Sequence, residues 1–209
     1  MLLALYFSLV YAPTERTMGQ VQRVFYFHLG NAWNAFLAFF LVMVASIGYL
    51  KTRSRRWDIY AEALAEVGVV FTTVVLITGS IWGRAAWNTW WTWDPRLTTT
   101  LVLWFIYDGY LALRASLENW ETRARLSAVY GIVGFVNVPI VFMSIRWWRT
   151  IHPVVISLSG MDMDPRMVPA MLASLLAFTL LLGVCTVLRA QISQSADALQ
   201  SMKDAFRQD

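Results

Sequence analysis

Five apolar stretches, each long enough to cross a lipid bilayer, constrain the fold of this chain more than any other feature of its sequence. They cover residues 24–50, 60–82, 97–113, 126–145 and 168–188. A helix needs about 20 residues to cross the hydrocarbon of a membrane. Because 58% of the residues are hydrophobic and 14% are charged, the composition is also more apolar than that of a soluble domain. The sequence predicts an all-α protein, a polytopic transmembrane helical bundle with five clear spans.

A sixth apolar segment opens the chain. It runs from Met1 to Tyr11 and is too short to cross a bilayer. It lacks the basic start and the small-residue cleavage site of a signal peptide. We therefore expect a short or truncated first helix. Because the linkers are short and no internal repeat is present, residues 1–209 are predicted to form a single integral-membrane domain.

Basic residues set the predicted orientation of the bundle. Ten of them fall in residues 51–57, in residues 114–125 and in the tail after residue 188, and these segments with the C-terminus are predicted to be cytoplasmic. Arginine pairs with carboxylates through two hydrogen bonds, so an arginine excess on the outer side indicates an acidic ligand. No feature indicates nucleic-acid binding. The seven basic residues of the outer side are all arginine: Arg16, Arg23, Arg84, Arg96, Arg146, Arg149 and Arg166.

A dense cluster of tryptophans lies between the second and third spans. Trp is large, rigid and amphipathic, so such a cluster can bury a planar apolar ligand at the membrane surface. If the segment is helical, Trp87, Trp90 and Trp91 share one face. The alternative is an aromatic belt, but a belt occupies both interfaces, whereas seven of the eleven tryptophans fall on this one. These seven are Trp82, Trp87, Trp90, Trp91 and Trp93, together with Trp147 and Trp148 of the next outer loop.

Both long outer loops end in the same three residues. Asp94-Pro95-Arg96 and Asp164-Pro165-Arg166 each precede an apolar span. An Asp at the N-cap followed by Pro at the first helical position is typical of a helix start. Helix capping is therefore the first role predicted for Asp94, and any functional role adds to it.

The chain has two histidines, and the predicted topology places both at the outer face. His28 lies near the outer end of the first full span, and His152 follows a span that Pro139 is expected to bend. Either histidine alone is more typical of an interfacial side chain. The pair beside a tryptophan platform favours haem, because imidazole binds haem iron axially, aromatic faces contact porphyrin and arginines pair with propionates.

The single cysteine excludes several other chemistries. Cys185 lies within the last span, so the chain cannot form an internal disulfide or attach haem covalently through Cys-x-x-Cys-His. No cluster of Cys and His has the spacing of a zinc site. Cys185 is also expected at the opposite end of its helix from the histidines, which disfavours a Cys-His catalytic pair. No nucleotide-binding loop is present, so this chain is not expected to hydrolyse ATP.

A few polar residues lie inside the predicted spans. Asp108 is costly within a membrane and a functional candidate, but it lies six residues from Arg114, so snorkelling toward the cytoplasmic side is favoured. Glu62 and Glu66 share a helix face and are expected to meet a partner or solvent. Asn137 is expected to bond backbone groups that the nearby proline frees.

These motifs together carry a family resemblance. The segment from Trp82 to Thr98 resembles the tryptophan-rich signature of the CcmC family, the haem exporter C proteins of cytochrome c maturation, within the CcmC/CcmF/CcsA haem-handling superfamily. Its Arg-Leu-Thr ending favours CcmC over the CcsA-type synthetases, whose motif typically ends in Asp-Pro-Lys-Glu. Residues 22–33 and 137–152 resemble the segments that carry the two haem-ligand histidines. The resemblance extends from about Arg16 to Arg189.

The resemblance implies specific roles. It implies that His28 and His152 are the axial ligands of a transient, non-covalent haem b. The residues implied to contact haem or present it to the chaperone are Trp82, Gly83, Trp87, Trp90, Trp91, Trp93 and Asp94. The candidates for propionate or chaperone contacts are Arg84, Arg96, Arg146 and Arg23.

The implied setting is the bacterial inner membrane. The tryptophan loop and both histidines are then periplasmic, and haem passes to the chaperone CcmE. The implied partners are the ABC transporter subunits CcmA and CcmB, the small membrane protein CcmD and the lipid bilayer. No enzymatic reaction is implied.

Two alternatives and three departures accompany this interpretation. A cytochrome c synthase that attaches haem to apocytochrome is disfavoured by the absence of a large soluble domain and of a second histidine pair. An electron-transfer cytochrome b normally has histidines within the hydrocarbon. The departures are the short first helix, residues 29–31 where the family commonly has a proline after the histidine, and Asp108 where an apolar residue is expected.

Overall fold

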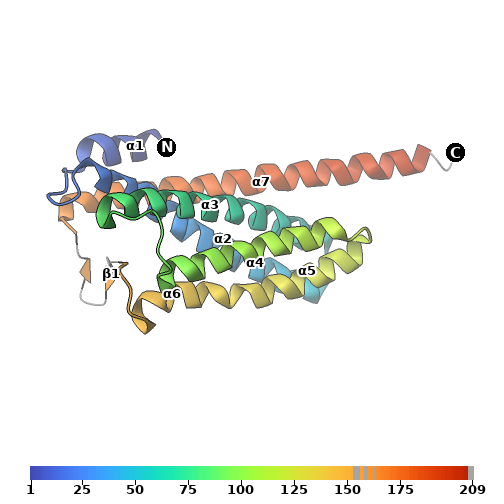
Figure 1. Ribbon diagram of the computed structural model, residues 1–209. Helices are drawn as coiled ribbons and strands as arrows, with labels where there is room; N and C mark the ends of the chain where they lie inside the picture. Colours follow the sequence, from blue (N-terminus) through green and yellow to red (C-terminus); the bar gives the residue numbers. More distant parts are fainter. Residues whose placement is uncertain (153–155, 158–159, 162, 207–209) are drawn as a thin grey trace.

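The computed structural model describes residues 1–152, 156–157, 160–161 and 163–206, which form a helical bundle (Figure 1). A two-stranded antiparallel hairpin in the last outer loop pairs Ile156 with Met161 and Ser157 with Gly160. The elements in chain order are α1 (Leu2–Tyr6), η1 (Phe7–Tyr11), η2 (Gln20–Arg23), α2 (Val24–Thr52), α3 (Arg55–Trp87), α4 (Pro95–Ser116), α5 (Trp120–Phe135), α6 (Asn137–Trp147), β1 (Ile156–Ser157), β2 (Gly160–Met161), η3 (Pro165–Met167) and α7 (Val168–Phe206).

The predicted polytopic membrane bundle is confirmed. Within the described residues, four helical segments are long and apolar enough to cross a membrane: Gln20–Thr52, Arg55–Trp87, Trp120–Trp147 and Pro165–Phe206. The remaining predicted span, residues 97–113, lies in α4, which falls outside this set because it is less apolar. Its 22 residues still rise about 33 Å, and it packs against α3, α5 and α6. The helical segment Leu2–Tyr11 is shorter than a membrane span.

Helices α3 and α7 extend well beyond the apolar windows that predicted them. Helix α3 begins at Arg55 rather than residue 60, and α7 continues past residue 188 to Phe206. Figure 1 shows the end of α7 projecting beyond the other helices. Arg207 lies outside the described residues. The windows mark only the apolar part of each helix, since a helix does not end where its hydrophobicity does.

The helical segment that precedes His152 is interrupted close to Pro139. Helix α5 ends at Phe135 and α6 begins at Asn137, with Pro139 in its first turn. The expectation for Asn137 was wrong in its detail. Its side-chain Nδ2 donates to the backbone oxygen of Thr99 at 3.1 Å, so it ties α6 to α4 instead of bonding the groups that the proline frees.

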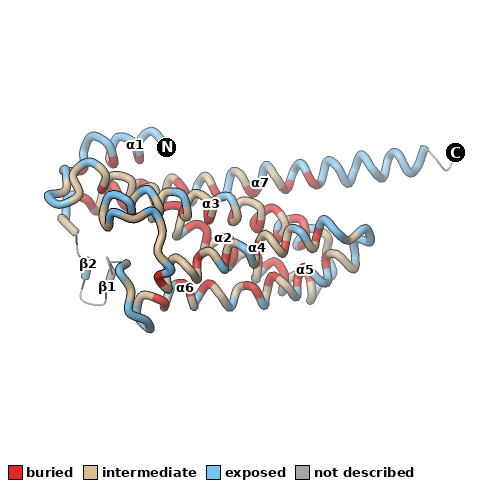
Figure 2. The backbone as a smooth tube through the Cα atoms, in the orientation of Figure 1, coloured by how far each residue is buried: buried red, intermediate tan, exposed pale blue. Residues whose placement is uncertain are grey.

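The outer surface of the bundle is apolar, as a lipid environment requires. Large hydrophobic side chains stand exposed on the membrane-facing sides of α3, α4 and α7, among them Val70, Phe105, Leu176 and Leu180. Figure 2 shows that the buried positions face inward between the helices. In water this surface would be an association or aggregation site, whereas in hydrocarbon it costs nothing to expose.

The core is centred on α2, which packs against α3, α5 and α7. Phe39 of α2 stacks on Tyr107 of α4 with ring centroids 3.6 Å apart and an interplanar angle of 11°. Gly68 of α3 lies directly against the same phenylalanine, because a Cβ built on it would be 2.6 Å from Phe39 Cε1. Small residues of this kind let membrane helices approach closely, which supplies packing energy where the hydrophobic effect is weak.

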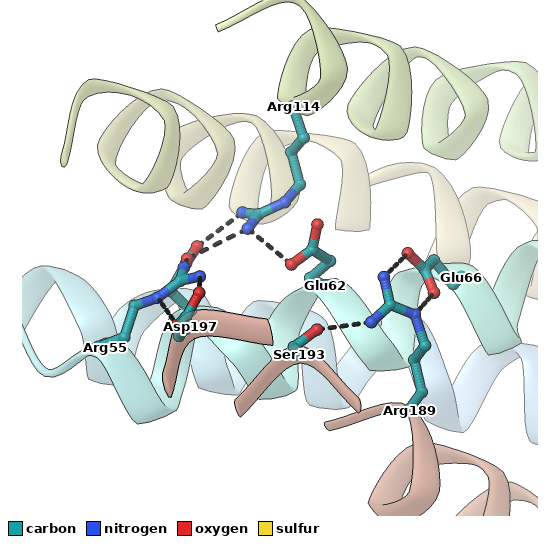
Figure 3. Close-up of polar contacts among 8 residues, drawn as sticks. Arg55, Glu62, Glu66, Arg114, Arg189, Ser193 and Asp197 are labelled. Carbon is teal, nitrogen blue, oxygen red and sulfur yellow. Dashed lines mark hydrogen bonds and ion pairs between the residues drawn. The ribbon is translucent and has the colours of Figure 1, made fainter. Parts of the chain in front are cut away.

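A network of charged side chains joins α3, α4 and α7 (Figure 3). It lies near the start of α3, whereas the tryptophan loop follows the end of α3. Arg114 donates to both carboxylate oxygens of Asp58 at 2.6 and 3.1 Å, and it lies 3.2 Å from Glu62. Arg189 binds Glu66 through two hydrogen bonds of 2.5 and 2.8 Å. The expectation that Glu62 and Glu66 meet a partner or solvent was therefore wrong: both pair within the chain.

Asp108 does not share this network. Asp108 was expected to snorkel toward the cytoplasmic side, where Arg114 lies, but the guanidinium of Arg114 is bound by Asp58. Within the described part of the chain, Oδ2 of Asp108 is buried without a hydrogen-bond partner.

Asp58 is predicted to contribute strongly to stability. Asp58 and Arg114 are 2% and 3% exposed, so Asp58→Ala leaves a buried guanidinium with Glu62 as its remaining carboxylate. Breaking a buried ion pair costs about 3–5 kcal/mol, and we expect a loss of about 3 kcal/mol in detergent unfolding. The control is Asp197→Ala, which removes a half-exposed partner of Arg55 and should cost at most about 1 kcal/mol. Equal effects of the two substitutions would contradict this assignment.

Candidate functional site

A cavity lies at the tryptophan-loop end of the bundle, between α2, α3 and α4. The centres of water-sized spheres can occupy about 60 Å³ inside it, and about 680 Å³ is free of protein atoms when the open mouth and its solvent are counted. The wall is mostly apolar, with Ala32, Ala35 and Phe36 from α2 facing Val75 and Leu76 from α3. Of the residues that the sequence singled out, six line this cavity: His28, Trp82, Trp87, Trp91, Arg96 and His152.

His28 is placed by helix packing. It lies one turn into α2, and its ring rests against α3, with Nδ1 3.0 Å from the hydroxyl of Thr78. The neighbouring Gly79 makes room for the ring, because a Cβ built on this glycine would be 3.2 Å from Cε1 of His28. The position of this imidazole is therefore set by two rigid helices.

His152 is placed by hydrogen bonds between two loops. Asp94 accepts hydrogen bonds from the hydroxyl of Thr150 at 2.8 Å and the backbone N–H of Ile151 at 3.0 Å. The Thr150 hydroxyl in turn accepts from the backbone N–H of His152 at 3.0 Å. The His152 ring then lies against Trp87, with ring centroids 6.4 Å apart.

Asp94 thus has the capping role predicted for it and a second role. It caps α4 by accepting from the backbone N–H of Arg96 at 2.9 Å, and the same carboxylate holds the segment that carries His152. Asp94 is 9% exposed and does not line the cavity. It acts on the site through other residues.

The tryptophan loop is not helical, so the predicted shared face of Trp87, Trp90 and Trp91 was wrong. Helix α3 ends at Trp87, and Asn88 takes a left-handed conformation with φ +56°. Left-handed backbone ends a helix, and Asn tolerates it better than most residues. The chain then runs without regular structure to Pro95.

The loop divides its tryptophans into two groups. Trp82 and Trp87 pack edge to face at 5.1 Å and line the cavity with Trp91. Trp90 and Trp93 point outward and are 60% and 76% exposed. Trp82, Trp87 and Trp91 therefore form part of the cavity wall, whereas Trp90 and Trp93 form part of the protein surface. Gly83 lies beneath the loop, where an added Cβ would be 3.4 Å from the backbone oxygen of Thr89 and from the ring of Trp87.

Of the four candidate arginines, only Arg96 lines the cavity. Its Nη1 donates to the backbone oxygen of Val141 on α6 at 2.6 Å. Arg84 donates to the backbone oxygen of Asn88 at 2.7 Å and so closes the end of α3. Arg146 lies over the ring of Phe142 at 5.0 Å, and Arg23 donates to the backbone oxygen of Ser8 at 2.6 Å.

Sequence reasoning missed the small polar residues of the cavity wall. Thr72, Gly79 and Ser80 of α3 and Thr100 of α4 all line it, and Thr78 contacts His28 from outside the lining. The available signal was a run of small residues, Thr-Gly-Ser at 78–80, inside an otherwise apolar span. Such residues mark places where membrane helices approach or bond one another.

Asp94→Ala is predicted to release the segment that carries His152. A hydrogen bond to a charged group contributes about 1.5–3 kcal/mol, so the backbone amide of Ile151 should exchange with solvent deuterium at least about tenfold faster. The measurement is amide hydrogen exchange of the peptide that spans Ile151 in the detergent-solubilised protein.

Asp164→Ala is the matched control for that experiment. Asp164 also precedes Pro and Arg and accepts from the backbone N–H of Arg166 at 2.9 Å. Hydrogen bonds from the Arg166 side chain hold the pKa of Asp164 at about 2, and within the described residues its bonds are local to Arg166. Asp164→Ala should therefore leave the exchange rate of the Ile151 amide unchanged. If Asp94→Ala and Asp164→Ala give the same exchange rate at Ile151, Asp94 does not hold the segment that carries His152.

Comparisons with known proteins identify related chains. The family model described as heme exporter protein C, CcmC, matches residues 1–203. A heme exporter protein C from Bradyrhizobium diazoefficiens is 37% identical over 172 residues, which cover 81% of this chain and 65% of the relative. A heme exporter protein C from Escherichia coli K12 is 34% identical over 180 residues, covering 86% and 73%. A putative ccmC-like mitochondrial protein of cytochrome c biosynthesis from Marchantia polymorpha is 32% identical over 187 residues, covering 89% and 79%.

Proposed function

The chain belongs to the CcmC family of heme exporter C proteins, and from this membership we propose that it holds haem in the cavity between His28 and His152 and delivers it to the haem chaperone CcmE. The observation that carries the proposal is that the chain's only two histidines line one cavity together with three tryptophans. Two imidazoles are the ligands of a six-coordinate haem iron. The haem is cargo here, and no bond in it needs to be broken.

The cavity wall suits the rest of the porphyrin. Trp82, Trp87 and Trp91 offer aromatic faces to a planar apolar ring. Arg96 is the cation on the wall and fits a propionate. The indole N–H of Trp82 is buried without a hydrogen-bond partner among the described residues, so it is a further donor that a polar group of the ligand can satisfy.

Reversible binding follows from what the cavity lacks. Cys185 is the single cysteine and lies on α7, away from the cavity wall. No thioether to haem can form from this chain, so haem is held by coordination and contact alone. Coordination by neutral side chains can be exchanged for ligands on an acceptor, which is the chemistry that delivery requires.

The exposed tryptophans form the proposed delivery surface. Trp90 and Trp93 are exposed at the tryptophan-loop end of the bundle, and Trp147 and Trp148 are exposed where α6 ends. Exposed, rigid aromatic side chains are typical of protein interfaces. We place this end at the periplasmic face of the bacterial inner membrane, with CcmE docking on it and the C-terminus of α7 in the cytoplasm.

The remaining partners follow from the family. CcmA and CcmB are proposed to supply the ATP-driven step, since this chain has no nucleotide-binding loop, and CcmD is proposed to bind within the membrane. The cytochrome c synthase alternative is disfavoured because a synthase in this superfamily uses a second histidine pair, and the chain contains only two histidines.

Replacing either histidine by Ala is predicted to remove the six-coordinate haem spectrum and abolish maturation of c-type cytochromes. Membrane insertion should stay normal, because it depends on the apolar helices. The measurements are the absorption spectrum of the purified protein and the amount of protein in the membrane. A double variant that binds haem and supports maturation as the wild type does would refute the proposal.

The two groups of tryptophans are predicted to affect different steps. Trp91→Ala opens the cavity wall and should lower the haem bound per molecule several-fold, because a large buried aromatic contact is lost. Trp93→Ala, its edge-to-face neighbour at 5.8 Å, should leave bound haem near normal and reduce the haem transferred to CcmE. The measurement is haem per molecule on each protein after mixing. If the two variants show the same defect, the division into wall and surface is wrong.

A further inference from the structure

We infer that Thr78 is a positioning residue for His28: its hydroxyl fixes the imidazole as the Nδ1–H tautomer and so leaves Nε2 as the nitrogen that binds the haem iron. The inference rests on the proposed function for the identity of the ligand. The tautomer itself is a property of the protein without haem, so it can be tested separately.

The argument starts from the single proton of the Thr78 hydroxyl. Thr78 Oγ1 lies 2.6 Å from the backbone oxygen of Val74, one turn back in α3, and 3.4 Å from that of Val75. A carbonyl oxygen can only accept, so the Thr78 hydroxyl is the donor in this bond. Threonine inside a helix commonly bonds in this way. The proton of Thr78 is therefore already used.

The bond to His28 must then run the other way. Nδ1 of His28 is 3.0 Å from Thr78 Oγ1, and an oxygen whose proton is engaged still has lone pairs to accept with. Nδ1 must carry the proton and donate it to Thr78. The other tautomer would need the Thr78 proton for Nδ1, and it would break the short bond to Val74.

Gly79 completes the placement of the ring. A Cβ on this residue would lie 3.2 Å from Cε1 and 3.8 Å from Nδ1 of His28, so the edge of the ring that carries Nδ1 and Cε1 rests on α3. Thr78 Oγ1 lies within hydrogen-bonding distance of Nδ1, and the backbone oxygen of Val75, one turn before Gly79, is a second acceptor for this ring. Nε2 remains as the ring nitrogen with a lone pair on the cavity wall that His28 lines.

The acceptor also sets how strongly His28 binds iron. A histidine ligand usually donates its second N–H, and this outer bond orients the ring and raises its basicity. A carboxylate acceptor does so most strongly because it is charged. Thr78 offers a neutral hydroxyl, which orients the ring with a smaller gain in basicity. That balance suits a ligand that must later release its haem.

The tautomer can be measured without haem by nitrogen-15 NMR of histidine-labelled protein. In the His152→Ala background His28 is the chain's only imidazole, so its two ring nitrogens are assigned without ambiguity. We expect a protonated Nδ1 and an unprotonated Nε2. Thr78→Ser should keep this pattern, and Thr78→Val should shift the population toward the Nε2–H form. If the His152→Ala protein with Thr78 unchanged shows the Nε2–H tautomer, the inference is overturned, whatever the Thr78 variants show.

The haem-loaded protein with both histidines gives the second measurement. Thr78→Val should weaken haem retention at least about tenfold, the range for loss of an outer partner of a metal ligand, and should change the low-spin haem spectrum and midpoint potential. Thr78→Ser should restore all three. The control is Thr179→Val, which removes a hydroxyl bonded to Leu175 in the same way on α7 and should change none of them.

The outcomes separate the inference from the proposed function. If the wild type binds no haem but His28 shows the Nδ1–H tautomer, the proposed function fails and the placement by Thr78 stands. If the wild type binds haem and Thr78→Val matches it in retention, spectrum and potential, the inference fails and the proposed function stands. Should Thr78→Val not fold, Thr78→Ala gives the same readouts, since it also removes the hydroxyl that accepts from Nδ1.

Discussion

The close packing of α2 against α3 is the contact on which the rest of the structure depends. At three levels a glycine of one helix lies against an aromatic ring of the other, where an added Cβ would stand 2.6 to 3.2 Å from the ring. The pairs are Gly48 with Trp57, Gly68 with Phe39 and Gly79 with His28. Steric fit of this kind fixes the register of two antiparallel helices in a medium where apolar surface alone does not. The third contact, between Gly79 and His28, is also part of the proposed ligand site.

The two histidines are consequently held by different means. His28 is part of the helix packing, so moving it requires α2 and α3 to shift. His152 lies on a loop and is held through Asp94 and Thr150, a few hydrogen bonds that a docking partner can replace at modest cost. A carrier needs one firm ligand for capture and one that can let go. In the proposed function, release begins at the His152 side, next to the exposed tryptophans.

The sequence was sufficient for the features that depend on local composition. Apolar windows predicted the spans, the Asp-Pro pairs predicted the helix starts, and the rarity of histidine drew attention to the two histidines that line the cavity. Features that depend on a distant partner were not predictable. The partners of Glu62 and Glu66 lie on helices far along the chain. The shared face of Trp87, Trp90 and Trp91 depended on a helical tryptophan loop, but the left-handed Asn88 ends the helix at a point that periodicity does not reveal.

The arginines at the tryptophan-loop end also have partners that the sequence alone does not predict, and the chemistry of guanidinium explains why. The excess of arginine predicted an acidic ligand. Arg23 and Arg84, however, donate hydrogen bonds to backbone oxygens of this chain, those of Ser8 and Asn88. Guanidinium has five donors in a planar fork, so one side chain can satisfy a carbonyl and still bind something else, which Lys does less well. Arg96 is the case that matters. Its Nη1 holds α6 through Val141 while the side chain lines the cavity. An anchored guanidinium loses little entropy when an anion binds, so in the proposed function the residue that fixes α6 against α4 is also the one placed to pair with a propionate of the haem.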